Sequence, residues 1–512
     1  MARASITNHS SGMSEHVLKI PEFNGVDQSR GVHNQDVCSS PDATNFIARF
    51  GSLSTANGVM PHMGVLPEIG SIPSAMPDAR LYQAHLVDAQ LQPYSRLVAV
   101  HQRGVYALND TVWENIGTVD GDGTDALNYR KGLEDGFEEW FLMTDGDGNF
   151  YRWNGTDALT IIPVTQGVEP DEVTPHPIQF QQIALLYDRL WGAVTKDQPD
   201  TIYWSQAFDP ENWELDYVMQ DDGGGFVEVP TFDGSRIRAI VAAFDDVLIF
   251  KDKSVHILNG TYPGEFSLSQ AYGTEGAIAA RTIVNAGSSL YFVASDGLCR
   301  YDGMTVSSMV SAGDRKLKDL WKRLNQKEIT RACAVHHKNV LYISVPLDND
   351  VRNSVVVEYH LLDGTYSLID IKNVDDFLVY REEQAETLLM ISGNQVYRYG
   401  VGTHFYKEPI NARWISPEIF CGSFASKKST GRIYMSVDAQ SLDYNRSPRM
   451  KITMYNDRRE RVRILVLKPG NNLIRKRVKI RGRVFRFQIE NMDGDPLTIN
   501  RGMEIHFEND AD

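Results

Sequence analysis

Five short segments with the same turn–strand–turn pattern recur along this 512-residue chain, and their spacing limits the folds that it can adopt. Each begins with a turn, which contains Gly or Asn in four of the five copies, continues as about four residues that alternate between apolar and polar, and ends in a second turn. The clearest copies are 147–155 and 296–303, and the looser copies are 103–110, 253–260 and 393–400. Each copy therefore predicts one half of a β-hairpin.

In two pairs of copies, corresponding positions are 44 residues apart, and each of the two wider gaps contains a further hairpin candidate. These candidates combine strands 183–193 with 201–205, and 339–345 with 354–359. A period of roughly 40 to 50 residues with four short strands per unit is typical of a β-propeller, whose blades bury their faces against neighbouring blades. We therefore predict an all-β fold built on a β-propeller of about seven blades. Unrelated hairpins in one large β-sandwich are the alternative.

The composition agrees with an all-β body. The chain has 40 Gly and 21 Pro residues for turns, and 22 Tyr, 21 Phe and 8 Trp residues of the kinds that strands favour. One amphipathic helix is predicted at 314–325, because its apolar residues follow helical spacing. These residues are Leu317, Leu320, Trp321 and Leu324. We expect the helix to pack on the rim of the propeller.

The two ends of the chain differ from the repeating middle. Residues 1–75 are rich in Ser, Asn, His, Pro and Met without a sustained period, and we interpret them as an extended N-terminal arm that becomes ordered only against something else. Residues 76–402 would form the propeller. Residues 403–512 alternate strongly between apolar and polar, and predict a separate antiparallel β-sandwich. Its predicted strands are 431–437, 450–455, 461–467 and 483–489.

The charge of the chain is polarised. The net charge is −16, but residues 405–512 contain 21 basic and 13 acidic residues, so that this segment carries +8 and residues 1–404 carry −24. Two basic series alternate with other residues in the C-terminal segment, and period-two spacing places each series on one face of a strand. They are Arg459, Arg461 and Arg463, followed by Arg475, Arg477, Lys479, Arg481 and Arg483.

Such basic faces have three interpretations. They could be ordinary solvated surface, a site for nucleic-acid phosphates, or a docking surface for the acidic part of the same or a neighbouring subunit. If the two strands share a sheet, their like charges are unfavourable unless an anionic surface covers them. We favour a protein partner, because an acidic chain binds DNA poorly.

Other chemistry finds little support in the sequence. No apolar stretch is long enough for a membrane span and the N-terminus lacks the apolar core of a secretory signal, so we expect a soluble protein made in the cytoplasm. Cys38, Cys299, Cys333 and Cys421 are far apart, which favours free buried thiols. The acidic turn 145–149 resembles half of an EF-hand loop, but position twelve is Thr156 and no bidentate carboxylate follows. We therefore predict no catalytic residues, no metal and no cofactor.

Seven short motifs in the middle of the chain resemble, in their order and spacing, one family of viral proteins. They are 186–191 (LYDRLW), 201–205 (TIYWS), 209–213 (DPENW), 237–240 (IRAI), 246–251 (DVLIFK), 273–276 (GTEG) and 290–297 (LYFVASDG). This succession is similar to that of the tail hub or nozzle proteins of short-tailed double-stranded DNA bacteriophages, the stabilisation protein or tail tubular protein B group. The resemblance covers residues 180–320 well, and the two ends of the chain only in general character.

The resemblance implies a structural virion protein that is not an enzyme. Six copies would form a homo-hexameric ring below the portal and the head–tail adaptor, and viral DNA would pass through it during ejection without sequence-specific binding. The protein would be made in the host cytoplasm and reside in the virion tail. The two basic series would then be subunit or adaptor interfaces.

Two other functions remain open at this point. A glycan-binding or glycoside-cleaving propeller involved in host attachment would need carboxylates and aromatic residues in one pocket between blade loops. A cellular scaffold propeller would bind peptides as a monomer.

Overall fold

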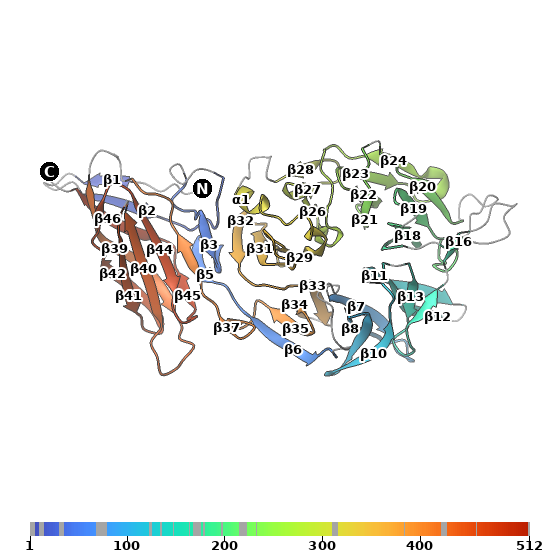
Figure 1. Ribbon diagram of the computed structural model, residues 1–512. Coiled ribbons are helices and arrows are strands. Elements are labelled where there is room, and N and C mark those ends of the chain that lie inside the picture. Colours follow the sequence, from blue (N-terminus) through green and yellow to red (C-terminus); the bar gives the residue numbers. More distant parts are fainter. Residues whose placement is uncertain are drawn as a thin grey trace.

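The structure is a computed structural model in which a β-propeller is joined at its side to a β-sandwich (Figure 1). It describes residues 6–9, 15–29, 35–67, 79–121, 125–133, 136–146, 148–162, 164–166, 176–177, 180–195, 198–213, 223–231, 233–309, 316–382, 385–420, 427–456 and 458–509. The propeller has seven four-stranded antiparallel sheets, so the expected count of about seven blades is confirmed.

Within each blade the strands follow one another outward from the central axis in chain order. Blade 1 contains β7 (Arg80–Val87), β8 (Pro93–His101), β9 (Gly104–Asn109) and β10 (Val112–Thr118), and blade 2 contains β11 (Asp125–Leu133), β12 (Gly136–Thr144), β13 (Phe150–Trp153) and β14 (Thr160–Ile162). Blade 3 contains β17 (Gln182–Leu186), β18 (Arg189–Ala193), β19 (Thr201–Trp204) and β20 (Gly225–Glu228), and blade 4 contains β21 (Ile237–Ala243), β22 (Asp246–Lys251), β23 (Val255–Asn259) and β24 (Ser267–Gln270). Blade 5 contains β25 (Val284–Asn285), β26 (Leu290–Ala294), β27 (Gly297–Tyr301) and β28 (Val306–Ser308), and blade 6 contains β29 (Cys333–His337), β30 (Val340–Val345), β31 (Val355–His360) and β32 (Thr365–Ile369).

Blade 7 is built from both ends of the chain. Its inner strands are β33 (Asp376–Glu382), β34 (Ala385–Ser392) and β35 (Gln395–Tyr399), and its outermost strand is β6 (Val59–Val65). This pairing closes the ring, because the last blade is completed by a strand that precedes the first. The propeller therefore includes residues that the predicted boundary at 76 assigns to the N-terminal arm.

The repeat found in the sequence is the third strand of the blade. The five copies become β9, β13, β23, β27 and β35, and the two additional hairpins supply β19 and β31. The hydrophobic core is divided in the same way, because each cluster of buried side chains lies between two neighbouring blades. Blades thus bury their faces against one another, which explains why no blade would be stable alone.

The C-terminal domain is a sandwich of two antiparallel sheets. The first sheet runs β1 (Ile6–His9), β2 (Glu15–Ile20), β46 (Met503–Asn509), β39 (Lys428–Ala439), β45 (Leu497–Ile499), β5 (Ser52–Thr55), β4 (Phe46–Arg49), with β42 (Gly470–Arg477) and β43 (Arg481–Gly482) also paired to β39. The second runs β3 (Asp42–Thr44), β38 (Arg413–Ile415), β44 (Phe485–Asn491), β40 (Arg449–Asn456), β41 (Glu460–Val466). All four strands predicted from alternation are present. Two-stranded ribbons β15 (Thr165–Gln166) with β16 (His176–Pro177) and β36 (His404–Phe405) with β37 (Glu408–Pro409) complete the strands.

The N-terminal segment is extended, as expected, but it is ordered on its own chain. β2 pairs with β46 and β3 pairs with β38, so both belong to the sandwich, while β6 belongs to the propeller. The described strands β2, β3 and β6 of this arm therefore pair with distant parts of their own chain, and ordering of the arm on assembly stays a prediction. The runs of alternating residues in this segment are too short to predict strands. The strands form because the C-terminal sheets offer edges with which they can pair.

The propeller and the sandwich share one hydrophobic core. A single cluster joins Leu341 and Val357 of blade 6 to Trp414 and Phe487 of the sandwich. Backbone contacts cross the same boundary, since Asn45 donates from its N–H to the carbonyl of Leu368 at 2.8 Å. The two domains are therefore packed as one body.

The predicted amphipathic helix is shorter than expected. α1 covers only Lys318–Trp321, and 3₁₀ turns are found at η1 (Pro263–Glu265), η2 (Ala280–Thr282) and η3 (Ile329–Arg331). The four apolar residues at 317–324 are all buried, in the cluster that joins blade 6 to the sandwich. Partners outside the helix compete for its N–H groups: the side-chain oxygen of Gln28 accepts from Leu320 N–H at 3.2 Å, and the carbonyl of Pro346 accepts from Asn325 N–H at 3.0 Å.

Candidate functional site

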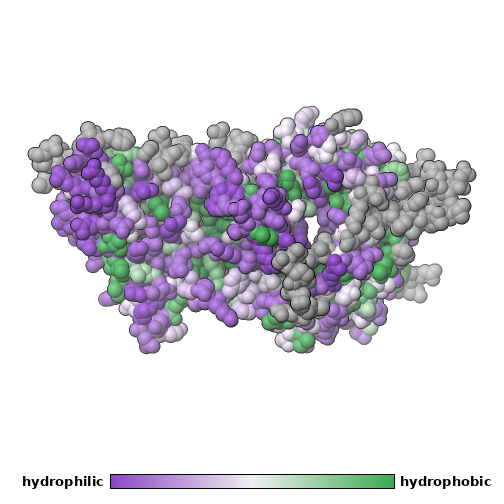
Figure 2. All heavy atoms as spheres, in the orientation of Figure 1, coloured by the Kyte–Doolittle hydropathy of each residue, from purple (hydrophilic) through white to green (hydrophobic). Residues whose placement is uncertain are grey.

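A cavity of about 510 Å³ lies on the central axis of the propeller, where the innermost strands of all blades converge. It is lined by residues of β7, β11, β17, β21, β29 and β33, and by η2 of blade 5. The space-filling view shows an opening at this position (Figure 2). Its volume is within the range of small-molecule sites, roughly 300 to 1,000 Å³.

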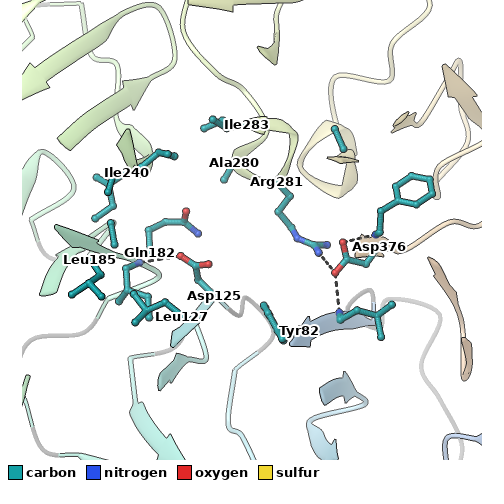
Figure 3. A pocket seen from close by; sticks show the side chains of 17 residues that line it. Tyr82, Asp125, Leu127, Gln182, Leu185, Ile240, Ala280, Arg281, Ile283 and Asp376 are labelled. Carbon is teal, nitrogen blue, oxygen red and sulfur yellow. Dashed lines mark hydrogen bonds and ion pairs between the residues drawn. The ribbon is translucent and has the colours of Figure 1, made fainter. Parts of the chain in front are cut away.

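Asp125 is the acidic group on one side of this cavity, next to Gln182 (Figure 3). Burial raises the pKa of Asp125 to about 6, against the opposing effect of hydrogen bonds from the N–H groups of Ile183 and Ala126. Each donor lies 3.0 Å from a carboxylate oxygen. Because Asp125 belongs to blade 2 and Ile183 to blade 3, this carboxylate connects two blades.

Arg281 and Asp376 form an ion pair on the other side of the cavity (Figure 3). Burial alone would lower the pKa of Arg281, but the charge of Asp376 more than reverses that effect. Asp376 also accepts a hydrogen bond from the N–H of Leu81 at 2.9 Å. The pair thus connects blade 7 with blades 5 and 1.

Sequence reasoning did not identify Asp125 or Asp376 as special. Both are the first residue of an innermost strand, and both accept from a backbone N–H of the next blade's innermost strand. Comparing the starts of the repeats could have found this shared position. Each of the two side chains therefore links its own blade to the next one.

The first predicted basic series, here the β41 row, consists of Arg459, Arg461 and Arg463. Arg459 lies in the turn before β41, and the other two lie on β41 itself. All three are exposed. Arg463 is paired in register with the fully buried Ile452, so the row is on the side of the sheet that faces the core, at its open edge.

The second series, here the β42–β43 row, consists of Arg475, Arg477, Lys479, Arg481 and Arg483, and all five are exposed. Arg475 lies over the ring of Tyr434 at 5.7 Å, and Arg477 lies 3.4 Å from Glu508. Arg477 is also directly opposite Arg432 in the sheet, an unfavourable pairing that Glu508 offsets.

The two basic rows belong to different sheets. β41 is at an end of the second sheet, whereas β42 pairs with β39 in the first. The two rows nevertheless approach each other at one end of the sandwich, through Asn456. Its side chain accepts from Arg459 N–H at 2.5 Å and donates to the carbonyl of Arg481 at 2.6 Å. The two rows are therefore linked by hydrogen bonds to the turn at Asn456, and no strand pairing joins them.

The acidic turn at 145–149 is stabilised internally. Burial would raise the pKa of Asp145, but hydrogen bonds from Asn149, Gly148 and Tyr151 lower it below its usual value. Its oxygens are therefore already occupied by donors. Within the described part of the chain, no group of three or more His, Cys, Asp or Glu side chains could hold a metal ion.

Cys38, Cys299 and Cys333 are buried thiols outside any disulfide bond, as expected, and Cys421 lies outside the described residues. Of the helices described here, none is long and apolar enough to cross a membrane.

No protein-family model matches the chain, and no curated protein matches it. Solved structures with a similar fold include BBS1N in complex with ARL6DN, at 10% identity and a TM-score of 0.42, covering 68% of this chain and 97% of that one. The Neurospora crassa Pan2 WD40 domain has 12% identity and a TM-score of 0.37, covering 68% and 95%. An exo-β-1,3-galactanase from Phanerochaete chrysosporium, with galactose, has 7% identity and a TM-score of 0.24, covering 76% and 96%. The likeness concerns the fold alone, and says nothing of function.

Proposed function

We propose that this protein is a structural virion protein that forms a ring, the nozzle or hub, of a short-tailed phage tail and docks to the head–tail adaptor. The observation that carries the proposal is the polarised charge: eight basic residues are exposed at the sandwich edges, whereas residues 1–404 carry −24. Such a surface suits docking between large acidic subunits. The choice of a phage tail as the assembly is supported by the motifs of residues 180–320, which resemble those of tail hub or nozzle proteins.

The central cavity is consistent with a structural role. Asp125, Arg281 and Asp376 connect neighbouring blades, and these contacts occupy the charged groups that a reaction would otherwise use. A ring component needs rigid subunits, and the core shared between propeller and sandwich provides such rigidity.

DNA would pass through the central channel that the copies of the ring enclose. The propeller's own cavity, of about 510 Å³, is the size of a small-molecule site and cannot admit a duplex. With a net charge of −16 per subunit, a ring would repel phosphate and let DNA slide without binding.

The test is assembly of a charge-reversed variant. Arg477→Glu, Lys479→Glu and Arg481→Glu change exposed side chains, so the triple variant should fold with an unchanged circular-dichroism spectrum. We expect it to fail to form rings or to join tails, as judged by negative-stain imaging of the protein alone and with phage tails. Normal assembly of this variant would refute the docking role of the β42–β43 row, and a protein that neither forms rings nor labels tails would refute the tail assignment.

A glycan-binding or glycoside-cleaving propeller is the second candidate, favoured by one observation. The pKa of Asp125, raised to about 6 in a cavity of suitable size, is that of a carboxyl that could act as an acid near neutral pH. This function predicts turnover or binding of bacterial surface polysaccharide that Asp125→Asn abolishes. The absence of any such activity in the wild-type protein would leave the tail assignment as the sole proposal.

A further inference from the structure

Three exposed aromatic residues lie at neighbouring turns of blades 3 and 4. Tyr187 is 40%, Phe208 69% and Phe244 37% exposed. The turns touch: Phe208 N–H donates to the carbonyl of Asp188 at 2.9 Å, and Tyr187 O–H donates to the carbonyl of Asp245 at 3.3 Å. We call these five residues the aromatic-acidic patch.

All five residues of the patch have a left-handed backbone. Their φ values are 53° at Tyr187, 57° at Asp188, 61° at Phe208, 57° at Phe244 and 64° at Asp245. Asp tolerates this conformation, but bulky side chains adopt it rarely and at a cost. Tyr187 and Phe244 also make contacts within the fold, with the carbonyl of Asp245 and the ring of Tyr301. Asn would suit position 208 better if folding were the only requirement, so the exposed ring of Phe208 indicates a surface that binds something.

The patch also carries negative charge that the described part of the chain leaves unbalanced. Among the described residues, Asp188, Asp245 and the neighbouring Asp246 form no ion pair. Burial and the charge of Asp245 raise the pKa of Asp246. Burial, Asp188 and Asp209 likewise raise the pKa of Tyr129 to about 12. A cationic and partly apolar partner is therefore the best complement.

The edge strand β41 of the same chain has those properties. The three arginines of the β41 row form no ion pair within the described structure. On the outer face of the strand, Val462, Ile464 and Val466 are 38%, 53% and 70% exposed. β41 pairs only with β40 among the described strands, so its other edge is free. Figure 2 shows hydrophobic residues at the surface of this end of the molecule.

We propose that the aromatic-acidic patch binds the β41 edge of a second copy of this chain. Arginine matches both carboxylates and aromatic faces, and the exposed valine and isoleucine side chains match the rings. β41 lies at the outer edge of the sandwich and blades 3 and 4 lie across the propeller from it, so one chain cannot make this contact with itself (Figure 1). A contact between two different surfaces is head-to-tail, and it closes into a ring when the rotation between subunits permits. The inference deepens the proposed function and rests on it for the biological need of a ring.

The test measures self-association of the purified full chain by analytical ultracentrifugation. Variant one carries Arg459→Glu, Arg461→Glu and Arg463→Glu, and variant two carries Asp188→Asn and Asp245→Asn, which keep the turn because Asn accepts positive φ. We expect each variant to weaken association about tenfold or more, and added salt to weaken the wild type. The control is Lys322→Glu, Lys327→Glu and Lys372→Glu, an equal change of charge on the exposed propeller surface, which should associate like the wild type.

Mixing the two variants gives the sharpest result. Variant one retains its patch and variant two retains its β41 edge, so a mixture should form dimers joined by one intact contact and no larger assembly. A mixture that stays monomeric, variants that associate like the wild type, or a monomeric wild type would each overturn the proposal. Capture of a glycan or of an unrelated basic peptide by the patch, without self-association, would also overturn it. If either variant forms normal rings in phage tails, this contact is refuted and the proposed function remains intact.

Discussion

Phe208 has a side chain that is 69% exposed on a backbone with φ of 61°, and neither property helps the chain to fold. Phe208→Asn should therefore stabilise the monomer by about 1 kcal/mol, because Asn adopts this conformation at lower cost and little buried area is lost. Urea unfolding measures the change. The same variant should associate more weakly, and a loss of stability would show that the ring of Phe208 packs more tightly than its exposure indicates.

Glu358 and His360 form a buried acid–base pair on β31, close to the joint with the sandwich. Burial raises the pKa of Glu358 to about 7 and lowers the pKa of His360 to about 4. The ring nitrogen Nε2 lies 3.9 Å from a carboxylate oxygen, and Tyr399 O–H donates to Glu358 at 2.9 Å. The positive charge of Arg49, from β4 of the sandwich, lowers the pKa of both groups: it disfavours the protonated imidazole of His360 and favours the ionised carboxylate of Glu358.

The two groups change stability with pH in opposite directions. Between about pH 4.5 and 7 the folded state holds more protons on Glu358 than the unfolded state does, so Glu358 makes stability fall as pH rises. Between about pH 4 and 6.5 the folded state holds fewer protons on His360, so His360 makes stability rise with pH. From pH 4.5 to 6.5 the two effects oppose each other.

Removing one member of the pair should expose the slope of the other. Relative to the wild type, Glu358→Gln removes the fall that Glu358 causes, so its stability should rise between about pH 4.5 and 7, by up to about 1.4 kcal/mol per pH unit. Relative to the wild type, His360→Gln removes the rise that His360 causes, so its stability should fall between about pH 4 and 6.5. Unfolding temperatures measured across this range check both, and parallel curves for the two variants and the wild type would contradict the prediction.

At the scale of elements, β6 is the strand on which closure of the propeller depends, and Gly58 positions its start. A Cβ atom at Gly58 would lie 2.2 Å from the carbonyl oxygen and 2.5 Å from the nitrogen of His404, both backbone atoms that cannot turn away. Gly58→Val should therefore destabilise the protein by about 2 kcal/mol or more and separate β6 from β35. Hydrogen exchange of the β35 amides measures the separation. Gly132→Val, where nothing lies within 4 Å of the added Cβ, is the matched control.

The elements also show what local sequence can and cannot reveal. Alternation identifies third strands such as β13 and β27, because turns and half-buried strands are encoded within a few residues. It misses β2 and β6, whose pairing partners are hundreds of residues away. It overstates the helix at 314–325, because apolar spacing shows which side chains become buried, whereas competing backbone partners decide how far a helix extends.

At the scale of the whole molecule, the shared core couples the two domains. Trp414 is fully buried in the cluster that contains both sandwich and blade 6 residues. We predict one unfolding transition by calorimetry, with Trp414→Ala lowering stability by about 3 to 5 kcal/mol and reducing protection of blade 6 amides as well as sandwich amides. Two separate transitions in the wild type, or loss of protection confined to the sandwich, would contradict the coupling.

Of the candidate surfaces, some features can be recognised in the sequence and others only in the tertiary structure. The two basic rows are visible in the sequence, because charge and period-two spacing are local properties of a strand. Their meeting through Asn456 is not, nor is the grouping of Tyr187, Phe208 and Phe244, because turns of separate blades come together only once the ring has closed.

By itself, the sequence determined the all-β class, the blade repeat, the alternating sandwich strands and the uneven charge, all of which depend on residues close together in the chain. Tertiary structure alone decided that blade 7 is completed by β6, that the N-terminal segment joins the sandwich, and that Asp125 and Asp376 connect blades. The physical reason is that these contacts join residues far apart in sequence, and form only when burial of the cores between blades compensates the entropy of closing the ring.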